Sequence, residues 1–120
     1  MKKIYYLNSC STCKRILKEL DLPKDVELQD IKINPLSAAQ LEELKNLSGH
    51  YESLFSKRAQ LYKSKGLKDK SLTEAEFKSY LLEHYTFLKR PVMVFDSEIF
   101  IGNSAKTIAA AKAYLVKNEY

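Results

Sequence analysis

Four short stretches of the chain carry the pattern of β-strands. Residues 3–8 are rich in β-forming side chains and end in a turn signal, and residues 26–33 mostly alternate between apolar and polar side chains. Residues 91–95 form the most β-like run, and residues 98–101 follow it after the tight turn Asp96-Ser97. The pattern therefore predicts two single strands near the start of the chain and a hairpin near its end.

Apolar residues at helical spacing predict helices between these strands. The expected helices run from Cys13 to a stop at Pro23, from a cap at Ser37 to a break at Gly49-His50, over residues 51–65, over residues 73–85, and over residues 104–117. Thr73 is expected to cap the fourth, with Glu76 completing a capping box. The apolar faces comprise Ile16, Leu17, Leu20; Leu41, Leu44, Leu47; Leu54, Phe55, Leu61, Tyr62; Phe77, Tyr80, Leu81, Leu82; and Ile108, Ala111, Leu115.

The order of these elements indicates an α/β fold. A strand–helix–strand unit comes first, then several helices, then a strand–strand–helix unit, which is the thioredoxin-like order with a helical insertion at about residues 37–86. The first crossover implies that its two strands pair in parallel. We expect a single domain over residues 1–120, with a mixed four-stranded sheet.

Composition places the chain among soluble globular domains. It has 120 residues, of which 45% are hydrophobic, with three glycines and three prolines. No run approaches the roughly 20 apolar residues that a membrane span requires. The start, Met1-Lys2-Lys3-Ile4, leads into a strand and is too short in apolar residues for a signal peptide, so we expect a cytoplasmic protein.

The chain carries a formal net charge of +5. Its densest cationic cluster comprises Lys63, Lys65, Lys68 and Lys70. Such a cluster is either a solvated surface or an anion-attracting field, and the latter would suit a thiolate and an oxyanion substrate equally.

The chain's two cysteines, Cys10 and Cys13, stand in a C-x-x-C motif between the first strand and the first helix. A bridge between them would close almost no loop and so stabilise little, whereas redox chemistry uses this spacing often. A zinc site would need two further ligands, and only His50 and His84 are candidates, neither in a second paired motif. We therefore expect a redox pair and no metal, with both histidines on the surface at helix ends.

The position of Cys10 favours a reactive thiolate. Free N–H groups and the positive end of the helix dipole should lower its pKa, and Lys14 and Arg15 add positive potential. Cys13 lies one helical turn later and should be more buried. Cys10 is therefore the predicted nucleophile and Cys13 the candidate resolving thiol.

Two arginines could contribute to the site. Arg90 precedes Pro91 at the start of the third strand, where the peptide bond is either trans, as most are, or cis, which would expose the Arg90 backbone beside the thiolate. Arg58 lies on the insertion; it is either a surface residue or, if the insertion folds over Cys10, a partner for an oxyanion.

The whole chain resembles the arsenate reductase (ArsC) family of the glutaredoxin-linked type, together with its Spx and YffB-type relatives. The resemblance rests on residues 6–15 around the cysteine pair and on four further segments: residues 30–37, residues 54–58 with Tyr62, residues 87–94, and Ile101-Gly102. It implies a thioredoxin fold with a mostly helical insertion. It also implies that Cys10 attacks arsenate, that Arg90 before a cis proline contacts the oxyanion, and that Arg58 matches the arginine that the Spx and short-reductase branches carry on the insertion.

Two functions follow from the resemblance. In one, the protein is a thiol-dependent reductase of an oxyanion such as arsenate, or of a disulfide. Cys13 or glutathione then resolves the adduct, and glutaredoxin or thioredoxin acts as reductant without a bound cofactor. In the other, a Cys10–Cys13 disulfide switches a regulator that binds RNA polymerase. Neither involves a membrane or direct contact with nucleic acid.

Overall fold

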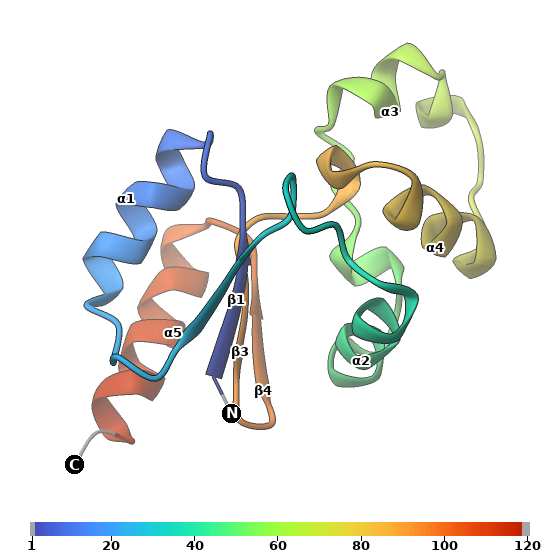
Figure 1. The fold of residues 1–120 in the computed structure, drawn as a ribbon. Coiled ribbons are helices and arrows are strands. Elements are labelled where there is room, and N and C mark those ends of the chain that lie inside the picture. Colours follow the sequence, from blue (N-terminus) through green and yellow to red (C-terminus); the bar gives the residue numbers. More distant parts are fainter. Residues whose placement is uncertain (1, 119–120) are drawn as a thin grey trace. The chain divides into compact units, whose positions relative to one another are not determined.

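The computed structural model describes residues 2–118, which divide into two compact units (Figure 1). The first unit comprises the described residues up to Asn34 and those from Arg90 onward, and the second comprises Pro35–Lys89. No helix in the described part of the chain is both long and apolar enough to cross a membrane.

The first unit is built on a four-stranded sheet. Its strands are β1 (Lys2–Tyr6), β2 (Glu27–Asp30), β3 (Val92–Phe95) and β4 (Glu98–Ile101), in the order β2-β1-β3-β4. β1 and β2 pair in parallel, while β3 is antiparallel to both β1 and β4. The predicted mixed sheet, parallel crossover and hairpin are confirmed.

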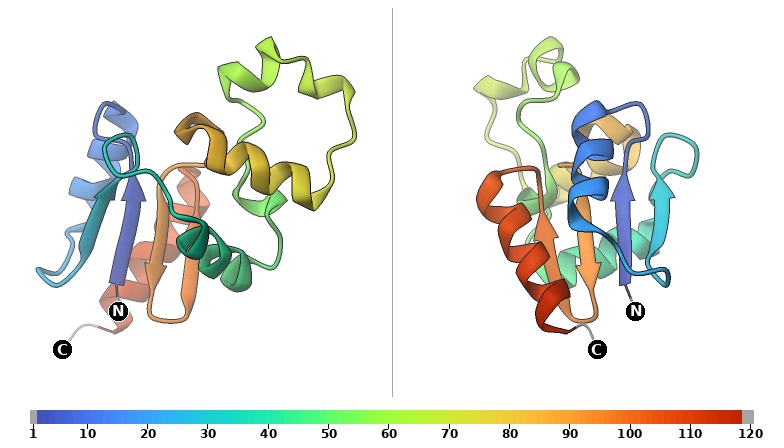
Figure 2. Two further views of the ribbon diagram at one scale, coloured as in Figure 1. Left: turned by 45° about the vertical axis from the view of Figure 1, so that its right-hand side comes forward. Right: turned by 90° about the vertical axis from the view of Figure 1, so that its left-hand side faces the viewer.

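Two helices cover one face of this sheet. α1 (Ser11–Leu20) and α5 (Ala105–Lys117) lie side by side in both views of the fold (Figures 1 and 2). The core between helices and sheet consists of Ile4, Ile16, Leu20, Met93, Phe95, Ile108, Ala111 and Leu115. The apolar faces predicted for these two helices therefore supply much of the core of the unit.

The ends of the early elements differ from the predicted ones. β2 stops at Asp30 instead of residue 33, because the N–H groups of Ile33 and Asn34 turn back to the carbonyl of Asp30 at 3.2 and 2.8 Å. Ile33 is consequently 75% exposed. β1 ends at Tyr6, two residues earlier than expected, since the chain bends at once towards α1.

α1 begins two residues before the predicted start at Cys13. Ser11 and Thr12 are its first residues, and Cys10 occupies the N-cap. Polar residues such as Ser11 and Thr12 are common in a first helical turn because its N–H groups need partners. At the other end Asp21, in a left-handed conformation (φ 50°), stops the helix before Pro23 is reached.

The second unit is helical. It contains α2 (Ala38–Ser48), α3 (Gln60–Ser64) and α4 (Glu74–Glu83), with short 3₁₀ turns η1 (Glu52–Leu54), η2 (Leu67–Asp69) and η3 (Tyr85–Phe87). Complete capping boxes begin α2 and α4: Ser37 with Gln40, and Thr73 with Glu76. The predicted caps and the break at Gly49 are confirmed, because these signals act over three residues and need no distant partner.

The continuous helix predicted over residues 51–65 is wrong. The chain is extended at Phe55, which forms an isolated antiparallel bridge with Leu88, and the Lys89 N–H donates to the Leu54 carbonyl at 2.8 Å. This pairing joins residues that are more than thirty positions apart in the chain. It uses backbone N–H and carbonyl groups that would otherwise form the hydrogen bonds of a helix. Leu82, placed on the apolar face of α4, is also 40% exposed.

Phe55 lies at the centre of the aromatic core of the second unit. Its ring stacks on Phe87 at 5.3 Å between centroids and packs against Phe77 at 4.9 Å and Tyr62 at 5.8 Å. Phe55 is 1% exposed. The break in the helix therefore brings this ring into the middle of the unit.

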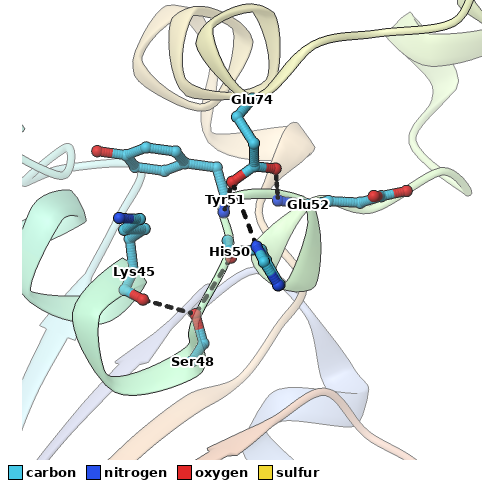
Figure 3. Close-up of polar contacts among 6 residues, drawn as sticks. All are labelled: Lys45, Ser48, His50, Tyr51, Glu52 and Glu74. Atoms are coloured by element: carbon cyan, nitrogen blue, oxygen red, sulfur yellow. Dashed lines mark hydrogen bonds and ion pairs between the residues drawn. The ribbon is translucent and has the colours of Figure 1, made fainter.

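Glu74 joins the start of α4 to the start of η1 (Figure 3). Its carboxylate accepts hydrogen bonds from the backbone N–H groups of Tyr51 at 2.7 Å and Glu52 at 3.1 Å. The Nδ1 atom of His50 lies 4.0 Å from the same carboxylate. Two backbone donors that begin η1 are thus satisfied by a side chain 22 and 23 residues further along the chain.

Glu74→Ala is expected to destabilise the helical unit by about 1–3 kcal/mol, because two backbone donors lose a charged acceptor. Glu74→Gln keeps one carbonyl oxygen as acceptor and should cost less. Urea denaturation followed by circular dichroism measures the difference. Glu43→Ala on the exposed face of α2 is the control, with an expected change within about 0.5 kcal/mol; equal losses in Glu74→Ala and Glu43→Ala would contradict the joining role.

Candidate active site

The turn between β1 and α1 presents Cys10. The Cys10 N–H donates to the Leu7 carbonyl at 3.0 Å, and the Cys10 carbonyl accepts from the Lys14 N–H at 3.1 Å. The residue is thereby held at the N-cap of α1 with an extended backbone. The Cys10 thiol is free and half-buried at the positive end of the helix.

The pKa of Cys10 lies below the ordinary value for a thiol. Burial acts to raise it, but this effect is outweighed by hydrogen bonds from the Cys13 backbone, the Cys13 thiol and the Thr12 backbone, together with the charge of Arg90. The backbone N–H of Thr12 can donate to the Cys10 sulfur because α1 starts two residues earlier than predicted. The polar residues of its first turn do not show this start in the hydrophobic pattern of the sequence. The thiolate of Cys10 is therefore favoured, as expected for a cysteine at a helix N-terminus.

Cys13 is the opposite kind of thiol. It is 1% exposed, and burial raises its pKa to about 11, with the charge and thiol of Cys10 adding to the rise. A hydrogen bond with the Leu7 backbone and the charge of Arg90 act in the lowering direction but are outweighed. Ionisation is therefore favoured for the Cys10 thiol, whereas the Cys13 thiol stays protonated at neutral pH.

Arg90 is the charged side chain that the sheet brings to the pair. Its charge lowers the pKa of both cysteines, and its side chain is half-buried. The Arg90–Pro91 peptide bond is cis, and the Pro91 carbonyl accepts from the Gly102 N–H at 2.9 Å. Gly102 has φ +94°, a conformation that favours glycine, so this contact depends on the residue that follows β4.

The structure does not assign the other basic residues named from the sequence to the cysteine pair. Lys14 and Arg15 are exposed on α1, and their charges are not among the main influences on the pKa of Cys10. Arg15 instead lines a hollow between α1 and α5 together with Asn103 and Lys112. Arg58 is exposed in the helical unit, and its approach to an oxyanion remains a prediction.

The two histidines stand apart from the cysteine chemistry. The side chain of His50 is 75% exposed, and that of His84 bonds the backbone and hydroxyl of Thr86 through Nδ1 at the start of η3. Across residues 2–118, no group of three or more His, Cys, Asp or Glu side chains could hold a metal ion.

We expect the pKa of Cys10 to be measurably low and to depend on Arg90. In Cys13→Ser, the ultraviolet absorbance of the Cys10 thiolate should rise at a pH below the ordinary thiol value of about 8.5, because lowering a pKa populates the thiolate at lower pH. In Cys13→Ser/Arg90→Gln the transition should move to higher pH, since a stabilising charge is lost. A midpoint at or above about 8.5 in the first variant contradicts the assignment of Cys10 as the nucleophile.

The fold and the position of the thiol pair together define a thioredoxin-like protein with a cysteine at the N-cap of its first helix. The ArsC family model matches residues 5–111 of the chain. The protein belongs to the ArsC family.

The chain is also similar to other proteins. It is 30% identical over 115 residues to an uncharacterized protein of Haemophilus influenzae, covering 94% of this chain and all of that one. A possible arsenate reductase from Streptococcus mutans is 35% identical with a TM-score of 0.67, over 82% of this chain and 87% of that one. The arsenate reductase of Vibrio cholerae, 19% identical, shares the fold with a TM-score of 0.76 over 92% and 96% of the two chains.

Proposed function

We propose that this protein is a thiol-dependent reductase in which the Cys10 thiolate attacks an oxyanion such as arsenate, or a disulfide. The observation that carries the proposal is the lowered pKa of a half-buried cysteine at a helix N-cap. A thiolate that is populated near neutral pH is the attacking species in such chemistry. Family membership and the likeness to the possible arsenate reductase of Streptococcus mutans support the same reaction class.

With arsenate, the reaction proceeds in two steps. The Cys10 sulfur forms a bond to arsenic and an oxygen leaves as water. A second thiolate then attacks the Cys10 sulfur, the sulfur–arsenic bond breaks, and its electron pair stays on arsenic. Arsenate is reduced by two electrons to arsenite while two thiols become a disulfide, so that every turnover consumes two thiols.

The opposite pKa shifts of the two cysteines indicate which of them acts first. The charge and thiol of Cys10 help to keep Cys13 protonated. Once Cys10 is covalently bound, the charge and hydrogen bond of its thiolate no longer act on Cys13, so the pKa of Cys13 should fall while burial continues to raise it. Cys13 is then the resolving thiol, with glutathione as the external alternative.

Arg90 is the cation proposed to hold the oxyanion. A guanidinium offers paired donors that fit an oxyanion, and this one already acts electrostatically on Cys10. Arg58 is proposed as a second contact from the helical unit. Stabilising the charge of the attacked group as well as that of the thiolate would lower the barrier to attack.

The test is turnover of the purified protein with arsenate, in one series with glutathione and glutaredoxin and in another with thioredoxin. Arsenite is quantified directly, which separates reduction from thiol oxidation by air. A disulfide substrate is assayed in parallel. Arsenite formation supports an arsenate reductase, and turnover of the disulfide alone supports a disulfide reductase. No turnover in any series overturns the proposal.

A further inference from the structure

The positive charge of the chain is concentrated in one segment, residues 57–70. Six basic residues and one acidic residue lie there, a balance of five positive charges that equals the formal net charge of +5 of the whole protein. The remaining residues contain fourteen basic and fourteen acidic side chains. The net charge that an approaching molecule meets therefore originates from this segment, which we call the basic segment.

The basic segment presents its cations to solvent. It comprises α3, η2 and the residues before and after them, and Arg58, Lys63, Lys68 and Lys70 are exposed. Lys57 and Lys65 are paired within the helical unit, with Glu52 at 3.0 Å and Glu83 at 3.5 Å. Lys63, Lys68 and Lys70 have no ion-pair partner among the described residues.

Three apolar side chains of the basic segment are buried, and Leu61 is half-buried. Ala59, Tyr62 and Leu67 are 8%, 9% and 1% exposed. The segment therefore exposes no aromatic ring on which a nucleic-acid base could stack, and only the half-buried Leu61 could offer apolar surface to a bilayer. Exposed ammonium groups of this kind are complementary in charge to carboxylates on the surface of a partner protein.

We propose that the basic segment is the docking surface for an acidic protein, and that this protein is the dithiol reductant of the Cys10–Cys13 disulfide. This inference rests on the proposed function, since each turnover consumes two thiols. In the step, two electrons and two protons pass from the reductant's dithiol to the disulfide. The reductant becomes a disulfide, and Cys10 and Cys13 return to thiols. A concentrated charge speeds encounter with an oppositely charged partner by about 10- to 10³-fold.

The test uses Lys63→Glu/Lys68→Glu/Lys70→Glu, with Lys63→Gln/Lys68→Gln/Lys70→Gln as a milder variant if the first fails to fold. The matched control, Lys24→Glu/Lys32→Glu/Lys106→Glu, makes the same change in charge at exposed lysines of the sheet unit. The oxidised protein is reduced by an acidic thioredoxin, by a lysine-substituted basic form of it, or by dithiothreitol. Reduction is quenched by alkylation and followed by mass spectrometry at about 0.01 M and 1 M salt, where the Debye lengths are about 30 and 3 Å.

At low salt, the substituted basic segment should slow reduction by the acidic thioredoxin about 10-fold. It should leave the dithiothreitol rate unchanged and reverse the preference between the two thioredoxins. High salt should remove these differences, and the control should retain most of the wild-type rate. Equal losses in the segment variant and the control overturn the docking surface.

A binding measurement separates this inference from the proposed function. Calorimetric titration with the acidic thioredoxin, its active cysteines replaced by serine, should show binding that the segment substitutions weaken and the control does not. If the wild-type protein shows no turnover with arsenate or with a disulfide substrate, the proposed function fails while this titration still decides the docking surface. Tighter binding of double-stranded DNA than of the acidic thioredoxin at the same salt concentration overturns the choice of partner.

Discussion

Cys10→Ser is expected to lower thiol-dependent reduction at least about 10³-fold, because an alcohol at this position does not ionise near neutral pH and the covalent step is lost. Everything that lowers the pKa of Cys10 acts on its thiolate: the N–H groups of Thr12 and Cys13, the Cys13 thiol and the charge of Arg90. A serine hydroxyl placed among the same groups remains protonated. Steady-state assays with the substrate identified by turnover measure the loss.

Two comparisons make this result specific. Serine is close in size to cysteine and suits a helix N-cap, so Cys10→Ser should retain its circular dichroism spectrum and midpoint of denaturation. Cys13→Ser should retain the first covalent step and depend on an external thiol for the second. If Cys10→Ser keeps more than a tenth of the wild-type rate, Cys10 is not the nucleophile.

Phe55→Ala is expected to destabilise the helical unit by about 3–5 kcal/mol, the usual cost of removing a buried phenylalanine. The ring is 1% exposed and contacts Tyr62, Phe77 and Phe87, so its removal leaves a cavity surrounded by aromatic rings. This loss is a large fraction of the 5–15 kcal/mol that stabilises a typical domain. Urea denaturation followed by circular dichroism should show a transition shifted to lower urea.

The control for Phe55→Ala is Leu82→Ala on α4 of the same unit. Leu82 is 40% exposed, so its truncation removes little buried surface and should cost well under half as much. Phe55→Leu refills much of the cavity and should fall between the two. If the alanine variants at positions 55 and 82 are destabilised equally, Phe55 is not the centre of this core.

Elements governed by neighbouring residues were predictable. The hairpin of β3 and β4 follows from an apolar run and a two-residue turn, and the caps at Ser37 and Thr73 depend on partners three residues away. The helix break at Phe55 was not predictable, because its cause is the bridge to Leu88. Apolar spacing at residues 54–62 fits a helix equally well, and only the distant strand-like partner decides against it.

In the candidate site, too, some features depend on neighbouring residues and others on residues distant in the sequence. By itself the sequence determined that Cys10 lies between a strand and a helix, and therefore that helix N–H groups would lower its pKa, since these donors come from the next few residues. The tertiary structure decided the contribution of Arg90. β3 runs antiparallel to β1 with Val92 opposite Tyr5, so the residues before β3 lie beside those that follow β1. A charge 80 positions away thus acts on Cys10, because the sheet register, which no local pattern encodes, places it there.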